Sequence, residues 1–315
     1  MSVDAATTPG PQRSHIYLDA VTDSRRWDRF RFRPGDVIVS TAPKCGTTWT
    51  IKLCAMLVAG SPDLGASLPT HSPWLDQKAL PQDALFADLE ARQGLRVIKT
   101  HTPLDGLPYV PHVRYVVCGR DPRDAYLSMI DHRSNRSLAY WQARDLQAGR
   151  APRTERPPPL DPNMDFAVWA TQGQHPWMLD GRGYQSVLSF NASWWDWRAL
   201  PNIHLIHYRD LTADLEGEAR RLAEFLGVAI PRALWPELLE AASFSAMRGD
   251  ADATAPGAEA GRWSSNADFF RAARVEQWRE ALSSENQTLY EAVNRDRFDP
   301  ALKAWLEQGR AALTR

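Results

Sequence analysis

Short apolar runs alternate with longer amphipathic segments along most of the chain of 315 residues. Four apolar runs predict strands, at residues 37–39, 95–100, 113–118 and 203–208. Helical spacing and capping residues predict helices at residues 49–57, 81–92, 122–132, 190–200, 215–226 and 231–242, and again from about residue 285. Strands that alternate with helices are typical of a parallel sheet covered on both faces. We therefore predict a single α/β domain with a central parallel sheet flanked by helices.

Three segments interrupt this pattern. Residues 1–26 are polar and contain Pro and Gly, so we expect a flexible N-terminal arm ahead of a domain over residues 27–315. Residues 134–185 mix Pro, Arg and Gly with aromatic residues and show little periodicity. Long irregular segments inside compact domains are usually functional or disordered, which predicts either a lid or acceptor-binding insertion or a solvated loop. Residues 248–266 predict a flexible loop.

Composition and charge exclude several classes of protein. The chain is 43% hydrophobic and 24% charged, which is ordinary for a globular protein. A net charge of -1 argues against nucleic acid as the main partner, since phosphate-backbone binding needs a basic surface. No run approaches eighteen apolar residues and the N-terminus has no apolar signal region, so no membrane association is expected. Three cysteines without C-x-x-C spacing predict a reduced, cytoplasmic protein.

The strand at residues 37–39 leads through Ser-Thr-Ala-Pro into a candidate anion-binding loop. The backbone N–H groups from Cys45 to Thr48 are the unpaired donors of a helix start. Gly46 permits close approach, Thr47 and Thr48 add hydroxyls, and Lys44 adds a positive charge. This predicts a phosphate or sulfate-ester ligand; the alternative is a strand–helix connection without a ligand. The lysine precedes the glycine by two positions, unlike the loop of nucleoside triphosphatases.

Lys99 and His101 follow at the end of the second strand. Residues two apart on a strand point to the same side, and the carboxyl edge of an open α/β sheet is where ligands bind. Histidine suits the role of general base because its pKa is close to neutral, whereas lysines suit the stabilisation of anionic oxygens. An isolated histidine is more often structural, so the interpretation depends on the neighbouring loop.

Three matches point to a family. The string PKCGTTW, Pro43 to Trp49, closely resembles the 5′-phosphosulfate loop PKSGTTW of the cytosolic-type sulfotransferases, which bind 3′-phosphoadenosine 5′-phosphosulfate (PAPS). Cys45 replaces the serine. The resemblance implies that this position contacts the phosphosulfate mainly through its backbone N–H, which cysteine retains. Residues 99–103, KTHTP, resemble the family segment that holds the catalytic histidine. Arg120 and Ser128 match the family pair that binds the 3′-phosphate.

The remaining family segments concern the nucleotide. The resemblance implies that five residues bind adenine: Trp49, Tyr208, Ser243, Phe244 and Met247. The alternative is that their side chains only pack in the core. The segment 269–278 resembles F-x-R-K-G-x-x-G-x-W, and it implies 3′-phosphate binding by Phe270, Arg271, Ala272 and Ala273. Because Ala272 and Ala273 replace a lysine and a glycine, one cation is lost and the backbone is less free to wrap the phosphate. The resemblance covers residues 30–310.

The resemblance implies PAPS-dependent transfer of a sulfuryl group to a hydroxyl of a small, apolar or aromatic acceptor. In the reaction that the resemblance implies, His101 is the general base of an in-line attack. Lys44, Lys99 and Ser128 assist catalysis there, and no metal is required. The altered 3′-phosphate segment keeps a non-catalytic nucleotide-binding member of the family as an alternative. A small-molecule kinase is a second alternative, although it needs a Mg²⁺-binding hydroxyl after the loop lysine. The oligomeric state is left open.

Overall fold

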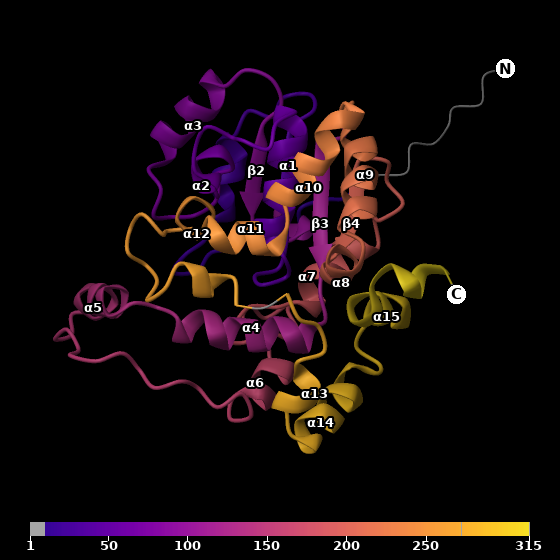
Figure 1. Ribbon diagram of the computed structural model, residues 1–315. Helices are drawn as coiled ribbons and strands as arrows, with labels where there is room; N and C mark the ends of the chain where they lie inside the picture. The colour runs from indigo at the N-terminus through magenta and orange to yellow at the C-terminus, as the bar shows by residue number, and fades with distance from the viewer. Residues whose placement is uncertain (1–9, 272, 315) are drawn as a thin grey trace.

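Four parallel strands form the sheet of the computed structural model, which describes residues 10–271 and 273–314. They are β1 (Val37–Ser40), β2 (Val97–Thr100), β3 (Arg114–Gly119) and β4 (Ile203–His207), in the order β2-β1-β3-β4 (Figure 1). All three pairings are parallel, so the four carboxyl ends lie at one edge. The chain leaves β1 toward one side and β3 toward the other, which makes a crevice outside β1 and β3 the expected binding place. The predicted α/β fold with a central parallel sheet is confirmed.

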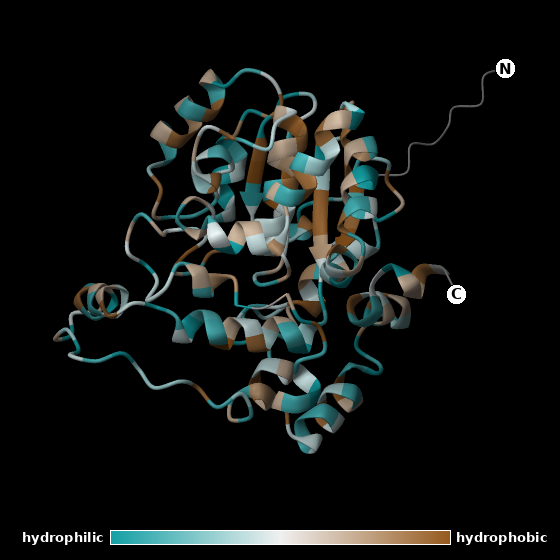
Figure 2. Cartoon of the chain, in the orientation of Figure 1, coloured by the Kyte–Doolittle hydropathy of each residue, from teal (hydrophilic) through white to brown (hydrophobic). Residues whose placement is uncertain are grey.

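Both faces of the sheet are buried, because alternate residues of each strand enter different cores. Val37 and Val39 pack toward α1 (Thr47–Ala59), α9 (Leu215–Leu226) and α10 (Trp235–Ala241). Ile38 and Val117 pack on the other face, which is covered by α4 (Pro122–Ser134), α7 (Leu188–Trp195) and α15 (Pro300–Gln308). In Figure 2 the strands are accordingly the most hydrophobic part of the ribbon.

Further helices lie around these layers, outside the segments expected to be irregular. They are α2 (Leu68–His71), α3 (Gln82–Ala91), α8 (Tyr208–Ala213), α11 (Phe244–Gly249), α13 (Trp278–Ala281) and α14 (Ser284–Asn294). Short 3-10 turns lie at Ser24–Arg29, Leu104–Gly106, Arg232–Leu234, Ala267–Phe269 and Gly309–Thr314. No helix in the described ranges is long and apolar enough to cross a membrane.

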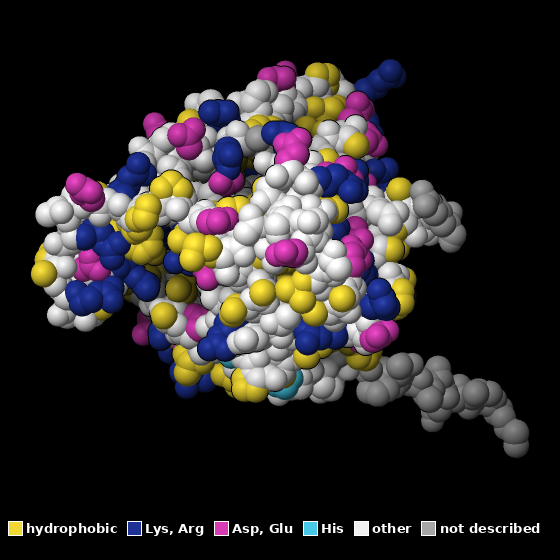
Figure 3. All heavy atoms as spheres, turned by 90° about the horizontal axis from the view of Figure 1, so that it is seen from below, with side chains coloured by type: hydrophobic (Ala, Val, Ile, Leu, Met, Phe, Trp, Pro, Cys, Tyr) yellow, Lys and Arg dark blue, Asp and Glu magenta, His cyan; other side chains and the backbone are white. Residues whose placement is uncertain are grey.

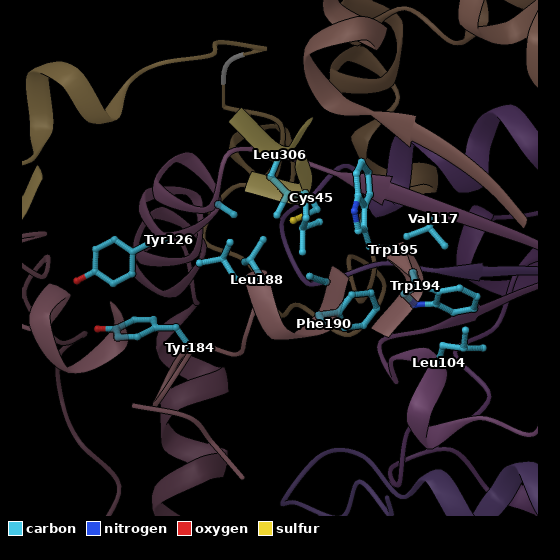
Figure 4. Packing of buried hydrophobic residues seen from close by; sticks show 14 of the residues in the cluster. Cys45, Leu104, Val117, Tyr126, Tyr184, Leu188, Phe190, Trp194, Trp195 and Leu306 are labelled. Atoms are coloured by element: carbon cyan, nitrogen blue, oxygen red, sulfur yellow. The ribbon is translucent and has the colours of Figure 1, made fainter. Parts of the chain in front are cut away.

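Helices also form where irregular structure is expected. The segment 134–185 contains α5 (Leu138–Gln147) and α6 (Phe166–Thr171), and the expected loop at 248–266 contains α12 (Ala251–Thr254). Ser137 explains the start of α5, because its hydroxyl accepts a hydrogen bond from the N–H of Tyr140 at 3.1 Å. At the end of the segment, Tyr184 packs edge to face on Tyr126 of α4, with ring centroids 5.2 Å apart (Figure 4). The insertion is therefore fastened to α4.

The described part of the expected arm, residues 10–26, packs against the domain. Tyr17 and Ser24 are buried, and the hydroxyl of Tyr17 donates to Asp105 at 2.9 Å. The backbone N–H of His15 donates to the carbonyl of Asp105 at 3.0 Å. The expectation of a loosely held arm is wrong for this part, because these contacts link it to the turn after β2. Residues 1–9 lie outside the described range.

Candidate active site

The loop between β1 and α1 has an unusual backbone. Lys44 has a φ of 67° and Gly46 a φ of 95°, both in the left-handed region. A Cβ at position 46 would lie 3.1 Å from Sγ of Cys118 and 3.1 Å from the ring of Tyr208. Glycine is therefore required there for conformation and for space. A lysine held in the left-handed region costs free energy, and such residues cluster at functional sites.

The amides of this loop remain largely free. The N–H groups of Gly46, Thr47 and Thr48 find no acceptor in residues 10–271 and 273–314. Cys45 differs from the expectation, because its N–H is donated to the carbonyl of Ala42 at 3.2 Å. Burial raises the pKa of the Cys45 thiol to about 12, so this side chain stays neutral. Three amides at the start of α1 are thus free to bind an anion, where the sequence predicts four.

His101 is oriented by the main chain of the same loop. Its Nδ1 donates to the carbonyl oxygen of Thr41 at 2.7 Å. Since a carbonyl only accepts, Nδ1 carries the proton and Nε2 keeps its lone pair. Burial and the charges of Lys99 and Lys44 hold the pKa of His101 well below its usual range. The imidazole is therefore neutral at pH 7 and able to accept a proton at Nε2.

Asp76 fixes the strand end that carries His101, and sequence reasoning missed it. This buried carboxylate accepts hydrogen bonds from the hydroxyls of Thr100 at 2.6 Å and Thr102 at 2.5 Å, and from the indole of Trp27 at 3.1 Å. The residues on both sides of His101 are thus held by one side chain. In the sequence, nothing distinguishes Asp76 from a surface aspartate, because its partners are distant along the chain.

Two ammonium groups lie close to the imidazole. The Nζ of Lys44 lies 4.5 Å from the centroid of the Phe269 ring, and that of Lys99 lies 4.6 Å from the centroid of the Trp74 ring. Neither lysine forms an ion pair within the described ranges. Burial lowers the pKa of Lys44 to about 7 and that of Lys99 to about 8. An anion bound here would restore both charges.

Trp74 and His132 complete the surroundings of these lysines, and the sequence did not reveal either. The ring of Trp74 meets His101 edge to face, with centroids 4.7 Å apart. The Nδ1 of His132 lies 3.4 Å from Nζ of Lys44. Trp74 arrives through an isolated bridge to Lys99, and His132 lies near the end of α4, so no local signal places them here.

Arg120 crosses the crevice between β1 and β3. Its Nη1 donates to the carbonyl of Lys44 at 2.9 Å, and its guanidinium lies 4.1 Å from the centroid of the Tyr208 ring. Its Nε is buried without a partner in the described ranges. Ser128 lies two turns along α4, half-buried, and its hydroxyl forms no hydrogen bond with any described residue. Both side chains thus have unused donors, as a phosphate site requires.

Asp124 draws the distant segment near residue 271 to this place. Its carboxylate accepts from the N–H of Glu276 at 2.6 Å and from that of Trp278 at 3.2 Å. Arg271 forms an ion pair with Asp131, which lies one turn beyond Ser128 on α4. Ala273 is half-buried in the same segment, and Ala272 lies outside the described residues. Of the predicted 3′-phosphate residues, Arg120 thus lies just before the start of α4, whereas Arg271 contacts the last turn of this helix.

The predicted adenine-binding residues come together in one cluster. Trp49 contacts Tyr208 and Phe244, with ring centroids 5.8 and 6.2 Å apart. Phe244 meets Phe270 at 6.1 Å, and Met247 is buried in the same core. Ser243 has a different role here, because its hydroxyl caps α11 by accepting from the N–H of Ala246 at 3.1 Å.

Taken together, the site offers free amides and cations for a polyanion, beside a neutral imidazole. Its positive groups are Lys44, Lys99 and Arg120, and the aromatic cluster flanks them. In the described chain, no group of three or more His, Cys, Asp or Glu side chains is placed to hold a metal ion. Such a site can bind a nucleotide-linked anion and remove a proton from a second molecule.

Known proteins share both the sequence and the fold. A glycolipid sulfotransferase of Mycobacterium bovis is 38% identical over 312 residues, which cover 94% of each chain. A glycolipid sulfotransferase of Mycobacterium tuberculosis is 37% identical over 311 residues, with the same coverage. Among solved structures, retinol dehydratase in complex with androsterone and the inactive cofactor PAP superposes with a TM-score of 0.66 at 19% identity, covering 87% of this chain and 84% of its own. That likeness concerns the fold alone.

The family model of the sulfotransferase domain matches residues 34–301. This span includes every candidate residue of the site, from the β1 loop to the segment at 270–273. The chain belongs to the sulfotransferase family, and it is a sulfotransferase.

Proposed function

We propose that the protein transfers a sulfuryl group from PAPS to a hydroxyl of an acceptor, with His101 as the general base. One observation carries this proposal: an imidazole whose Nε2 is unprotonated lies beside two lysines that have no counter-ion in the described ranges, and beside a glycine–threonine loop with free amides. Solved structures of the same fold hold PAP, the product of PAPS, which supports this donor.

The proposed roles follow from charge and position. Nε2 of His101 takes the proton of the acceptor hydroxyl as its oxygen forms a bond to sulfur and the bond from sulfur to the 5′-phosphate breaks. Lys44 and Lys99 hold the sulfuryl oxygens and the departing phosphate, together with the amides of Gly46 to Thr48. Arg120, Ser128 and Arg271 bind the 3′-phosphate, and the cluster around Trp49 binds adenine.

For the acceptor, we propose a hydroxyl on a molecule with an apolar or aromatic part. The rings of Trp74 and Phe269 lie beside the two lysines, where such a part would contact them. The relatives named as glycolipid sulfotransferases make a glycolipid the first acceptor class to examine. The insertion at 134–185 is the proposed acceptor-binding or lid segment, because it is joined to α4 at Tyr184 and borders the site at Arg136.

The direct test incubates the protein with radiolabelled PAPS and a panel of phenols, alcohols and glycolipids, with products read by mass. We expect labelled sulfate esters and release of PAP. Binding of PAP without transfer to any acceptor would favour the non-catalytic alternative. Mg²⁺-dependent consumption of ATP would favour the kinase.

Nucleotide affinity is expected to fall as the pH rises above neutral. Burial places the pKa of Lys44 at about 7 and that of Lys99 at about 8, and a bound polyanion raises both. Below pH 7 both lysines are charged already; above pH 8 binding must include proton uptake. Since one pKa unit corresponds to about tenfold in affinity, we expect PAP to bind at least about tenfold more weakly at pH 9 than at pH 6.5.

Calorimetry in two buffers of different ionisation enthalpy measures both the affinity and the proton uptake. Lys44→Met serves as the matched variant, because it removes one of the two titrating groups and should flatten the profile. An affinity that stays constant or rises over this range would contradict the assignment of these lysines.

A further inference from the structure

Two more arginines lie near the lysines of the site, Arg136 on the far side of His132 from Lys44 and Arg262 near His132 and Lys99. The Nε2 of His132 accepts from Nη2 of Arg136 at 2.8 Å, while its Nδ1 faces Nζ of Lys44. Arg262 lies close enough to His132 and to Lys99 to lower the pKa of each. The roles proposed above for PAPS use neither Arg136 nor Arg262.

The main chain fixes these arginines relative to each other. An isolated antiparallel bridge joins Arg136 to Trp263, and the N–H of Ser137 donates to the carbonyl of Arg262 at 3.1 Å. The guanidinium of Arg136 lies between two rings, 4.2 Å from the centroid of Trp263 and 4.4 Å from that of Tyr140. Aromatic rings that stack on the faces of a guanidinium leave the N–H groups at its edge free to donate hydrogen bonds.

Neither arginine has a counter-ion. Within residues 10–271 and 273–314, Arg136 and Arg262 form no ion pair, and Nη1 of Arg136 is buried without any partner. Two buried guanidiniums elsewhere in the fold show the contrast, with carboxylates at 2.5 and 2.9 Å: Arg96 with Asp36 and Arg123 with Asp121. Burial lowers the pKa of Arg136 only to about 10, so it remains charged at neutral pH. A half-buried guanidinium that has no counter-ion, and one of whose nitrogens is buried without a partner, favours a bound anion.

The wider surface has the same sign. In Figure 3, Lys and Arg side chains gather on the projecting segment at the left, where Figure 1 places α5. Arg150 and Arg153 belong to this segment, and both contact Asp145 there. Basic surfaces beside a site raise the local concentration of anionic ligands.

We propose that Arg136 and Arg262 bind an acid group of the acceptor, a carboxylate or a phosphate ester, while another oxygen of the same molecule faces His101. The preferred acceptor is then a hydroxyl compound that already carries a negative charge. This inference rests on the proposed transfer reaction, and it adds a charge requirement that the reaction itself does not have.

The test uses two pairs of acceptors that differ only in charge: a hydroxynaphthoic acid with its methyl ester, and octyl glucuronide with its methyl ester. Each is assayed with PAPS for kcat/KM, and each is titrated into PAP-loaded protein by calorimetry. We expect wild-type protein to prefer the acid of at least one pair by about tenfold, as a charge-assisted contact would give. Arg136→Met and Arg262→Met should each reduce that ratio to about one-third or less of its wild-type value.

Arg198→Met is the matched control, because Arg198 also stacks on a tryptophan, 4.1 Å from the centroid of Trp195, but lies outside the site. It should keep the wild-type preference. Arg136→Lys tests charge against shape, and thermal unfolding confirms that each variant folds.

Equal rates and equal binding for acid and ester in both pairs, or no binding of either acid, would overturn the inference. So would an Arg136→Met variant that loses PAP affinity as strongly as acid affinity, because the arginine would then belong to the nucleotide site. If no acceptor is sulfated at all, the proposed reaction fails, while the calorimetric preference for acid over ester still decides the charge requirement.

Discussion

His101→Ala should lower kcat/KM for sulfuryl transfer by about a thousandfold and leave PAP affinity within about threefold of wild type. The imidazole is the only described group at the site that combines a free nitrogen lone pair with a neutral state fixed by a main-chain contact, from Nδ1 to the carbonyl of Thr41. Its loss removes the proton acceptor but none of the cations or amides that hold the nucleotide. Steady-state kinetics and calorimetry of the same preparation measure the two effects separately.

Two controls sharpen this result. His112→Ala removes an exposed histidine far from the sheet edge and should have wild-type kinetics. His132→Ala removes the other imidazole near Lys44. The Nε2 of His132 already accepts a hydrogen bond from Arg136. Should His132→Ala abolish turnover while His101→Ala retains it, the base would have to be reassigned to His132.

Arg120→Met should weaken binding of PAP by about 30-fold and binding of AMP by less than about threefold, because a charge-assisted contact to a phosphate contributes about 2 kcal/mol. The methionine keeps an apolar stem against Tyr208, so most of the packing is retained. The lost group is the fork whose Nε has no partner in the described ranges. Calorimetric titration of both nucleotides into wild type and variant gives the comparison.

Arg220→Met provides the matched control, since Arg220 lies 4.3 Å from the centroid of Trp235 on the outer layer of helices. It should bind both nucleotides as wild type does. Equal losses of PAP and AMP affinity in Arg120→Met would show that Arg120 supports the loop through the carbonyl of Lys44 rather than reading the 3′-phosphate.

The sequence predicted the parts of this fold that have local signals. Apolar runs located all four strands, with differences of at most two residues at their ends, and helical spacing located α1, α4 and α9. Because parallel strands share a carboxyl edge, the position of Lys44, Lys99 and Arg120 at one place also followed from the pattern. The contacts agree with this: Arg120 donates to the carbonyl of Lys44.

The rest depended on contacts between distant segments. Trp74, Asp76 and His132 reach the site through tertiary packing, so no motif or spacing marks them. The two short helices of the insertion escaped prediction for a similar reason. The helix α6 has six residues and is stabilised by packing against α14, and a proline-rich stretch at residues 151–162 separates α5 from α6.

Thr41 has a consequence for how mutations act on this site. Its carbonyl aligns the imidazole, and its hydroxyl pairs with that of Thr47 at 2.5 Å. No exchange of the side chain at position 41 deletes a main-chain oxygen, so genetic variation there leaves the tautomer of His101 intact and alters only the hydroxyl pair. Only a shift of the backbone would misalign the imidazole. The backbone conformation of the loop, and not the identity of residue 41, is therefore what selection has to preserve.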